Sequence, residues 1–171
     1  MAFVVRRLTE DDAEALRTLR LEALQTVPEA FLSSYEEEAA KPFAWFRTVA
    51  RGPDRNAIFG AFEDGVLAGM AGFVAGERVK ERHKGTLVGV YVRPSLQRQG
   101  AGRALVEAVI AHAATRVTVL EATVSASNHP AVALYRSLGF IRFGTEPKAV
   151  QIGGRFLDND LLQIDFSGRP S

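Results

Sequence analysis

The pattern of apolar and polar positions in the first fifty residues predicts a strand followed by two helical regions. Apolar residues dominate 2–8, and Thr9 is followed three residues later by an acid, which is typical of a capped helix start. Apolar residues then recur with helical spacing to about Gln25. A second helical region is expected over 34–49, broken at Pro42, and its aromatic residues are interpreted as core packing.

The middle of the chain has a strand pattern. Two β-rich runs, 57–62 and 66–75, are joined by Glu63-Asp64-Gly65, a turn sequence that favours an antiparallel hairpin. A polar, charged interruption over 77–84 separates this hairpin from a third apolar run over 85–92. We therefore expect three consecutive strands.

The last third of the chain alternates helical and extended patterns. In order, we expect a helix over 103–114, a strand over 117–124, a helix from Asn128 to Gly139, and closing strands over 140–144 and 160–166 around the Gly153-Gly154 turn. The whole chain thus predicts a mixed α+β fold. The strand–helix–strand crossover in it favours a parallel strand pair beside the loop that precedes residue 103.

Composition narrows the class of protein. The 171 residues fit one domain, which we place at 3–167 with a short tail at 168–171, and 47% of them are apolar. The net charge of +1 gives no indication of a nucleic-acid or membrane-surface partner. There are no cysteines, so disulfides, thiolate metal sites and a cysteine nucleophile are excluded, and no spacing indicates a metal site. In the first residues the charges follow a very short apolar run, which is the wrong order and length for a signal peptide, so we expect a cytoplasmic location.

A short basic glycine loop, Gln97-Arg98-Gln99-Gly100-Ala101-Gly102, lies between the strand over 85–92 and the helix over 103–114. A helix N-terminus carries unpaired N–H groups and partial positive charge, and glycines let a bulky anion approach closely. The loop therefore predicts a phosphate-binding site.

Two familiar phosphate loops fit this segment poorly. A nucleoside triphosphatase loop ends in Gly-Lys-Ser/Thr, but Gly102 is followed by Arg103. A dinucleotide fingerprint needs a third glycine, and it needs a tight turn immediately after the strand. Here Leu105 occupies the position of the third glycine, and seven residues separate Val92 from Gly100. Glu121, at a suitable distance downstream, is weak support for that reading.

A third pattern fits both this loop and a later segment. The glycine loop is followed by Asn128, and then by Ala131-Val-Ala-Leu134-Tyr135-Arg-Ser-Leu-Gly139-Phe140. These two motifs, in this order and on these elements, resemble the GNAT superfamily of acyl-CoA-dependent N-acyltransferases. Residues 16–31 resemble the first helix of that family and its following loop, so the likeness extends over essentially the whole chain.

The resemblance implies a fold and a cofactor. The fold is a mixed, mostly antiparallel twisted sheet, with a parallel central strand pair splayed around acyl-CoA and helices on its flanks. The cofactor is acetyl-CoA, with its pyrophosphate on the backbone N–H groups of the loop and no metal. Arg93, Arg98 and Arg103 add local positive charge that suits its phosphates. The implied cofactor contacts are Val90, Tyr91, Val92, Gln97, Arg98, Gln99, Gly100, Ala101, Gly102, Arg103, Asn128, Ala131, Leu134, Tyr135 and Arg136.

The resemblance also assigns chemistry. The backbone of Val90 to Val92 matches the strand that pairs with the pantetheine arm, and an N–H of Val90 or Tyr91 would polarise the thioester carbonyl. Tyr135 matches the catalytic tyrosine that protonates the leaving sulfur, since a phenol with a pKa of about 10 stays protonated at neutral pH. Asn128 matches a pantetheine ligand and is also a suitable helix cap.

The general base is where this chain departs from a common family pattern, because the strand over 85–92 has no acid. Glu77, Glu81 and His83, in the loop before that strand, are the candidates, acting directly or through water. The acids of 36–38 are candidates for the acceptor side, although a charge run is usually a solvated face. The other histidines, at positions 112 and 129, are expected at the surface or as helix caps.

Together these observations predict a single-domain N-acetyltransferase that transfers the acetyl group directly to a primary amine in a ternary complex. A small-molecule acceptor is favoured, because the segments 25–42 and 76–84 are short and show no strongly charged groove. A protein N-terminus or lysine is the alternative acceptor. A non-catalytic acyl-CoA-binding regulator is the alternative of another class, and a homodimer is consistent with the resemblance.

Overall fold

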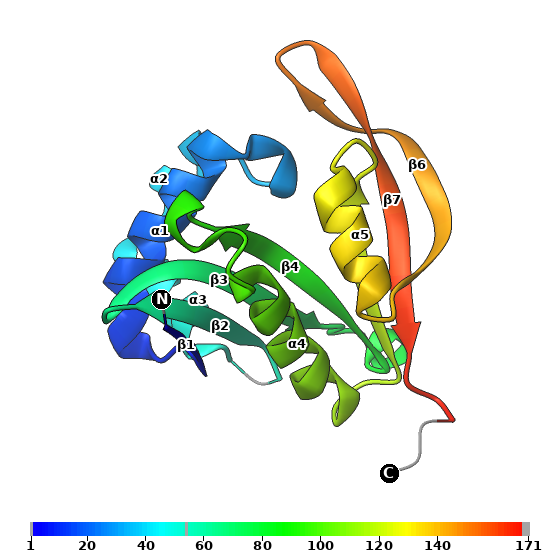
Figure 1. Cartoon of the computed structure of the whole chain (residues 1–171), viewed down its shortest axis with the longest axis horizontal. Helices are drawn as coiled ribbons and strands as arrows, with labels where there is room; N and C mark the ends of the chain where they lie inside the picture. Colours follow the sequence, from blue (N-terminus) through cyan, green and yellow to red (C-terminus); the bar gives the residue numbers. More distant parts are fainter. Residues whose placement is uncertain (1, 54, 169–171) are drawn as a thin grey trace.

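A computed structural model of the chain describes residues 2–53 and 55–168. Its strands form one seven-stranded sheet in the order β1-β2-β3-β4-β5-β7-β6 (Figure 1). They are β1 (Phe3–Arg7), β2 (Ala57–Glu63), β3 (Val66–Ala75), β4 (Lys84–Val92), β5 (Val119–Ser125), β6 (Ile141–Ile152) and β7 (Arg155–Asp165). Every neighbouring pair is antiparallel except β4 and β5, which are parallel. The predicted fold class is confirmed.

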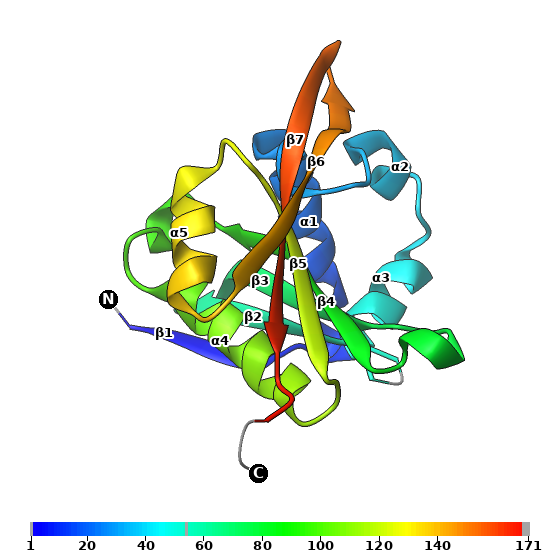
Figure 2. The ribbon, with the colours of Figure 1, turned by 90° about the vertical axis from the view of Figure 1, so that its right-hand side faces the viewer.

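Helices cover both faces of the sheet. They are α1 (Ala13–Thr26), α2 (Tyr35–Ala39), α3 (Phe43–Arg51), α4 (Ala101–Ala114) and α5 (His129–Ser137). Short 3-10 turns, η1 (Glu10–Asp12), η2 (Pro28–Ala30), η3 (Val79–Glu81) and η4 (Pro94–Leu96), lie between the longer elements. Figure 2 shows α4 and α5 on one side of the sheet, and α1, α2 and α3 on the other. Among the described residues, no helix is both long and apolar enough to cross a bilayer.

Two apolar clusters hold these layers together. The larger one joins α4 and α5 to the sheet and includes the fully buried Leu105, Leu120 and Leu162. The second lies under α1 and includes Leu16 and Leu19. Burying a side chain of this size contributes about 1.5–3 kcal/mol. The helices are therefore fixed to the sheet on both sides of the β4–β5 pair.

The C-terminal hairpin is longer than the sequence pattern predicts. The expected strands 140–144 and 160–166 extend to twelve residues in β6 and eleven in β7, and the hairpin stands beyond the rest of the sheet (Figure 1). Pro147 and the exposed side chains of β6 hide the strand pattern, since a proline within a sheet is confined to an edge or a bulge. Both conditions hold here, because β6 is an edge strand and its register shifts between Glu146 and Val150. Most of the predicted tail, 168–171, lies outside the described residues.

His112 corrects a second prediction. The sequence predicts this residue at the surface or as a cap, but it is only 8% exposed and packs between α4 and strands β2 and β3. Its ring packs edge-on against Phe59 and Phe73, and its Nε2 lies 3.0 Å from the carbonyl oxygen of Arg55. Burial lowers the pKa of His112, so the neutral ring is the form that the core accepts. His129 is exposed at the first turn of α5, as expected.

Candidate functional site

The parallel strands β4 and β5 separate halfway along β4. Among the described residues their pairing runs from Lys84 and Val119 to Leu87 and Ala122 and then stops. The rest of β4 remains paired with β3 on its other side. The edge of β4 that faces β5 therefore offers unpaired backbone groups, and such an edge can accept a further extended chain.

A β-bulge lies where the two strands separate. Gly89 and Val90 together stand opposite the single residue Ala71 of β3. Gly89 has φ +60°, the left-handed conformation that a glycine adopts at the first position of such a bulge. A bulge twists its strand and turns its backbone groups, which explains why the pairing with β5 ends here.

The glycine loop lies beyond the C-terminal end of β4. Gly100 is the N-cap of α4 and has φ +85°, and a Cβ at this position would meet no atom within 4 Å. The first intrahelical bond of α4 runs from the Ala104 N–H to the Gly100 carbonyl. Within the described residues, the backbone N–H groups of 100–103 have no backbone partner. The loop thus combines free donors, the positive end of a helix and open space, as an anion site requires.

Three contacts fix the shape of this loop. Leu96 is fully buried in the larger apolar cluster. The side-chain amide of Gln97 donates to the Val92 carbonyl at 3.0 Å, and that of Gln99 donates to the Ser95 carbonyl at 2.6 Å. Gln97 and Gln99 therefore act on the loop through their side chains, and the backbone N–H groups are left to face a ligand.

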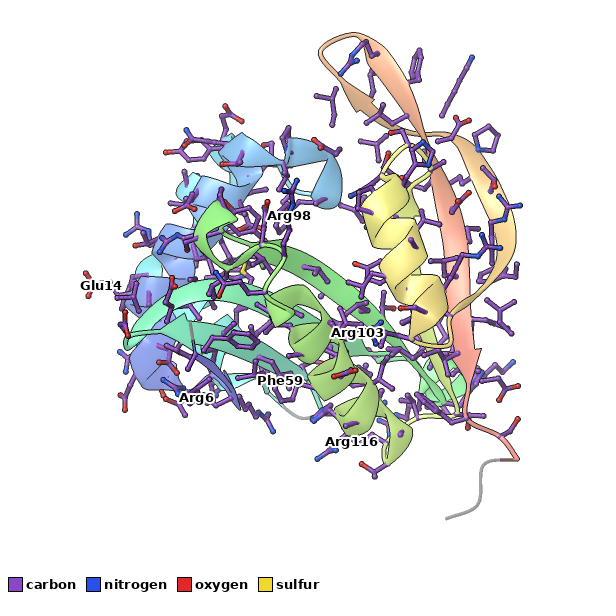
Figure 3. The ribbon with its side chains drawn as sticks, in the orientation of Figure 1. Arg6, Glu14, Phe59, Arg98, Arg103 and Arg116 are labelled. Atoms are coloured by element: carbon purple, nitrogen blue, oxygen red, sulfur yellow. The ribbon has the colours of Figure 1, made fainter. Side chains whose placement is uncertain are left out.

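The three arginines near the loop have different surroundings. Arg93 turns toward α1, where Nε and Nη2 bind the Glu22 carboxylate and Nη1 donates to the Leu67 carbonyl. Arg103 points from α4 toward α5 and donates to the Ser137 hydroxyl at 2.7 Å (Figure 3). Arg98, in the loop itself with φ +63°, is exposed and has no side-chain partner among the described residues. Of these three arginines, Arg98 is the one whose guanidinium has no partner among the described residues and is free for a phosphate.

Helix α5 borders the same space on the β5 side. A Cβ on Gly102 would lie 3.8 Å from Cγ2 of Val92 and 3.9 Å from Cδ2 of Leu134, so the start of α4 is close to both β4 and α5. The Asn128 side chain caps α5 by accepting from the Ala131 N–H at 3.3 Å. Its amide NH₂ has no partner among the described residues and can serve a ligand.

Tyr135 lies on the buried side of α5. It is 6% exposed, and its ring packs against Phe140 with 5.6 Å between ring centroids. Burial raises the pKa of the Tyr135 phenol to about 12. Among the described residues the Tyr135 hydroxyl has no hydrogen-bond partner. It is nevertheless not fully enclosed, because in this part of the chain the fully enclosed side-chain oxygen without a partner belongs to Glu63. The Tyr135 hydroxyl therefore reaches open space as a protonated donor.

The segment between α1 and α2 lies on the far side of the space that β4, the glycine loop and α5 border. Turn η2 lies against β4, β5 and β6. A groove of about 440 Å³ separates this segment from the tip of the β6–β7 hairpin. Its lining includes Phe31, Ser33 and Glu36 from one side and Gln151 from the other. Phe31 connects this groove to the bulge, since its Cε1 would lie 3.7 Å from a Cβ on Gly89.

The residues considered as a general base are not at this end of the sheet. Glu77, Glu81 and His83 precede β4 and lie at its N-terminal end, where β4 still pairs with β5. The bulge at Gly89 is five residues further along β4, which at about 3.3 Å per residue is about 16 Å away. Of the acids at 36–38, Glu36 and Glu37 are exposed, whereas Glu38 is buried.

The structure therefore brings most of the predicted site residues into one wedge, bounded by β4, the glycine loop and α5. Arg136 and Ala131 are on α5 with Tyr135, and Arg136 is exposed. The Tyr91 side chain turns instead to the α1 side, where its hydroxyl donates to Glu22 at 3.0 Å. Sequence reasoning missed Gly89, although an isolated glycine in a strand pattern is a bulge signal.

The chain is similar in sequence to known acetyltransferases and acyltransferases. The family described as "Acetyltransferase (GNAT) family" matches residues 15–140. The Escherichia coli L-amino acid N-acyltransferase MnaT is 31% identical over 140 residues, which are 77% of this chain and 76% of that protein. The described residues include no cluster of three metal-ligating side chains of the His, Cys, Asp and Glu types.

One further relative and one solved structure are also similar to this chain. The E. coli alanine N-acetyltransferase of ribosomal protein bS18 is 46% identical over 72 residues, which are 42% of this chain and 47% of that protein. The match thus spans about half the length of that relative. A phosphinothricin acetyltransferase from Sinorhizobium meliloti, solved in complex with acetyl-CoA, has the same fold, with a TM-score of 0.79 at 21% identity over 96% of this chain and 89% of that one.

Proposed function

Because the chain belongs to the GNAT acetyltransferase family, we propose that it transfers an acetyl group from acetyl-CoA to the amine of a small molecule. The observation that carries this proposal is the open, left-handed Gly100 at the N-terminus of α4, placed beside the free edge of β4. The proposed domain is 3–167, since strands near both ends of that range belong to the same sheet.

The donor site follows from the shape of the wedge. The pyrophosphate of acetyl-CoA binds the free N–H groups of 100–103, and Arg98 adds a charge-assisted contact. The pantetheine arm lies along the unpaired edge of β4 as an extra strand, and Asn128 donates to it from the other side. This arrangement directs the thioester toward the bulge at Gly89 and Val90.

The reaction is direct attack by the amine on the thioester carbon. The chain has no cysteine to hold an acyl group, so both substrates are bound together. As the amine nitrogen forms its bond to carbon, negative charge grows on the carbonyl oxygen, and an N–H of Val90 or Tyr91 on the β4 edge stabilises it. The C–S bond then breaks and releases CoA as the thiol.

Tyr135 supplies the proton for the leaving sulfur. Its raised pKa keeps the phenol protonated throughout the working range, and its hydroxyl has no competing partner in the described residues. A hydrogen bond from the Tyr135 hydroxyl stabilises the thiolate as the C–S bond breaks, and because a thiol has a pKa of about 8.5 the released CoA is protonated at neutral pH. The amine loses its proton to water, because the candidate bases Glu77, Glu81 and His83 are at the far end of β4.

A second acceptor class is favoured by one comparison. The 46% identity with the ribosomal-protein alanine N-acetyltransferase makes a protein N-terminus the alternative acceptor. The small-molecule acceptor is preferred because MnaT, named for L-amino acids, matches about three quarters of both chains. A cytoplasmic site of action, which the sequence suggests, and a homodimer, which the family resemblance suggests, are further parts of the proposal.

The test is the release of free thiol from acetyl-CoA with a panel of L-amino acids, simple alkylamines and peptides with N-terminal alanine. We expect release with at least one small amine, and little with acetyl-CoA alone. Tight binding of CoA without release for any acceptor would favour a regulatory CoA-binding domain instead. Release with the peptides alone would move the assignment to the protein acceptor.

A further inference from the structure

Arg20, on the inner face of α1, belongs to a buried ion pair that the proposed chemistry does not use. Its Nε donates to Oε2 of Glu38 at 2.8 Å, and its Nη2 contacts Oε1 of the same carboxylate. Glu38 is 1% exposed, and the Arg20 side chain is 13% exposed. Two parallel contacts of this kind fix the plane of the guanidinium.

Aromatic rings border the same guanidinium. The Arg20 Cζ lies 5.7 Å from the ring centroid of Phe31 and 5.8 Å from that of Trp45. A cation at such a distance from a ring is attracted to its face, and the rings also limit the movement of the side chain. Arg20 is therefore held from three elements, with Glu38 on α2, Trp45 on α3 and Phe31 in the loop after η2.

The third nitrogen of Arg20 faces the end of the β4–β5 pairing. Its Nη1 would lie 3.4 Å from a Cβ on Gly89, and Phe31 Cε1 would lie 3.7 Å from the same position. Guanidinium has five N–H donors, and the Glu38 carboxylate uses Nε and Nη2. Among the described residues Nη1 has no acceptor. A rigid, cationic donor thus stands beside the bulge where the thioester is expected.

We propose that Nη1 of Arg20 binds a carboxylate of the acceptor, so that the acceptor is an amino acid whose amine lies next to the acid. This inference rests on the proposed function and names the substrate class of the same site. It makes Arg20 a specificity-determining residue, since it touches the acceptor and not the reacting bond.

Charge balance supports this choice of acceptor. The Arg20–Glu38 pair is already neutral, and an anion without a counter-charge would place a second negative group beside a buried carboxylate. An amino acid binds with its ammonium beside its carboxylate and leaves the cluster neutral until the amine gives up its proton. A planar carboxylate also matches the geometry of the remaining guanidinium donors. A peptide N-terminus has an amide where an amino acid has its acid, and it would not use this contact.

Gly89 is part of the same site. Any side chain there would enter the space in front of Nη1, at 3.4 Å from that atom. The glycine is also required by its φ of +60°, which other residues rarely adopt. The bulge therefore serves both to end the pairing with β5 and to leave room for a ligand at Arg20.

The test compares common L-amino acids with their own carboxamides as acceptors. The quantity measured is the ratio of kcat/KM for each acid to that for its amide, in the wild type and in Arg20→Lys. Lysine keeps the charge next to Glu38 but has no second nitrogen for the acceptor. We expect this ratio to fall at least about tenfold in Arg20→Lys, mainly through a higher KM for the acids. Intrinsic differences between acid and amide amines cancel in the comparison.

Two variants make the test independent of folding defects. Arg17→Gln, one turn earlier on α1 at an exposed position, should leave the ratio unchanged. Arg20→Gln combined with Glu38→Gln removes both charges and should lower the ratio as Arg20→Lys does. An unchanged ratio in both Arg20 variants, or an equal loss for acids and amides, would overturn the inference and leave the proposed function standing. Release with alkylamines but with no acid or amide would also overturn the inference alone, and no thiol release with any amine of the panel would overturn both.

Discussion

The guanidinium of Arg93 and the carboxylate of Glu22 lie 2.8 Å apart, between Nη2 and Oε2, and join the end of β4 to helix α1. A third contact of Arg93, from Nη1 to the Leu67 carbonyl, adds β3 to this connection. The Arg93 guanidinium lowers the pKa of Glu22, because it stabilises the ionised carboxylate. Arg93 is thus a structural residue beside the glycine loop.

This relationship predicts different effects for two nearby arginines. Arg93→Ala should lower the unfolding free energy by about 1–2 kcal/mol, since the hydrogen-bonded pair is partly exposed and its strength is reduced by solvent. It should leave the affinity for CoA within about twofold. Arg98→Ala should do the opposite, with unchanged stability and weaker CoA binding. Thermal unfolding and CoA titration of both variants check this, and weak CoA binding by a well-folded Arg93→Ala would make Arg93 a ligand.

Removal of the Tyr135 hydroxyl should affect turnover and not binding. Tyr135→Phe keeps the ring against Phe140 and should lower kcat by about a hundredfold or more, the effect of losing a general acid. The Kd for CoA should stay nearly constant. Steady-state kinetics with a calorimetric Kd separates the two quantities. A variant with full kcat would remove Tyr135 from the reaction.

The raised pKa of Tyr135 predicts a loss of stability in alkali. The unfolded phenol ionises as the pH passes about 10, whereas burial holds the folded pKa at about 12. The stability is therefore fully present below pH 10 and falls as the pH rises to 12, by about 3 kcal/mol at about 1.4 kcal/mol per pKa unit. Denaturant unfolding at several pH values should show this fall in the wild type. In Tyr135→Phe the total fall in unfolding free energy between pH 10 and pH 12 should be smaller by about 3 kcal/mol.

His112 predicts the complementary effect in acid. Burial lowers its folded pKa, so the unfolded state takes up the proton first as the pH falls below about 6.5. Stability should therefore be full above that pH and decrease below it. His112→Gln, which can still donate to the Arg55 carbonyl, should lose this part of the pH dependence. If the variant and the wild type had parallel curves from pH 7 to 5, the buried neutral ring would be refuted.

Local signals explain what could be predicted from the sequence. The order of β4, glycine loop, α4 and β5 follows from features within a few residues of each other, and the crossover rule then requires the parallel pair that the structure has. The cap at Gly100 and the start of α5 at Asn128 are local in the same sense.

Contacts between distant residues explain what could not be predicted. Arg93 is next to the glycine loop in sequence, but its partner Glu22 is 71 positions away. Arg20 and Glu38 are 18 positions apart on two helices, and no spacing rule connects them. Gly89 is a local signal for a bulge, but which residue of β3 lies opposite it depends on the register between the two strands, and the sequence of β4 does not contain that register. The exposed side chains of β6 give its sequence no strand pattern, and the segment forms a strand because β7 pairs with it.

The central claim is that the loop at Gly100 holds the pyrophosphate of acyl-CoA, and calorimetric titration of CoA into two glycine variants tests it most directly. Gly100→Glu puts a carboxylate where the phosphate is expected. Gly65→Glu is the matched control, because Gly65 also has a positive φ, of +79°, and also has no atom within 4 Å of its Cβ position. We expect Gly100→Glu to weaken CoA binding at least about tenfold and Gly65→Glu to leave it unchanged. Equal affinity in the two variants would contradict the account.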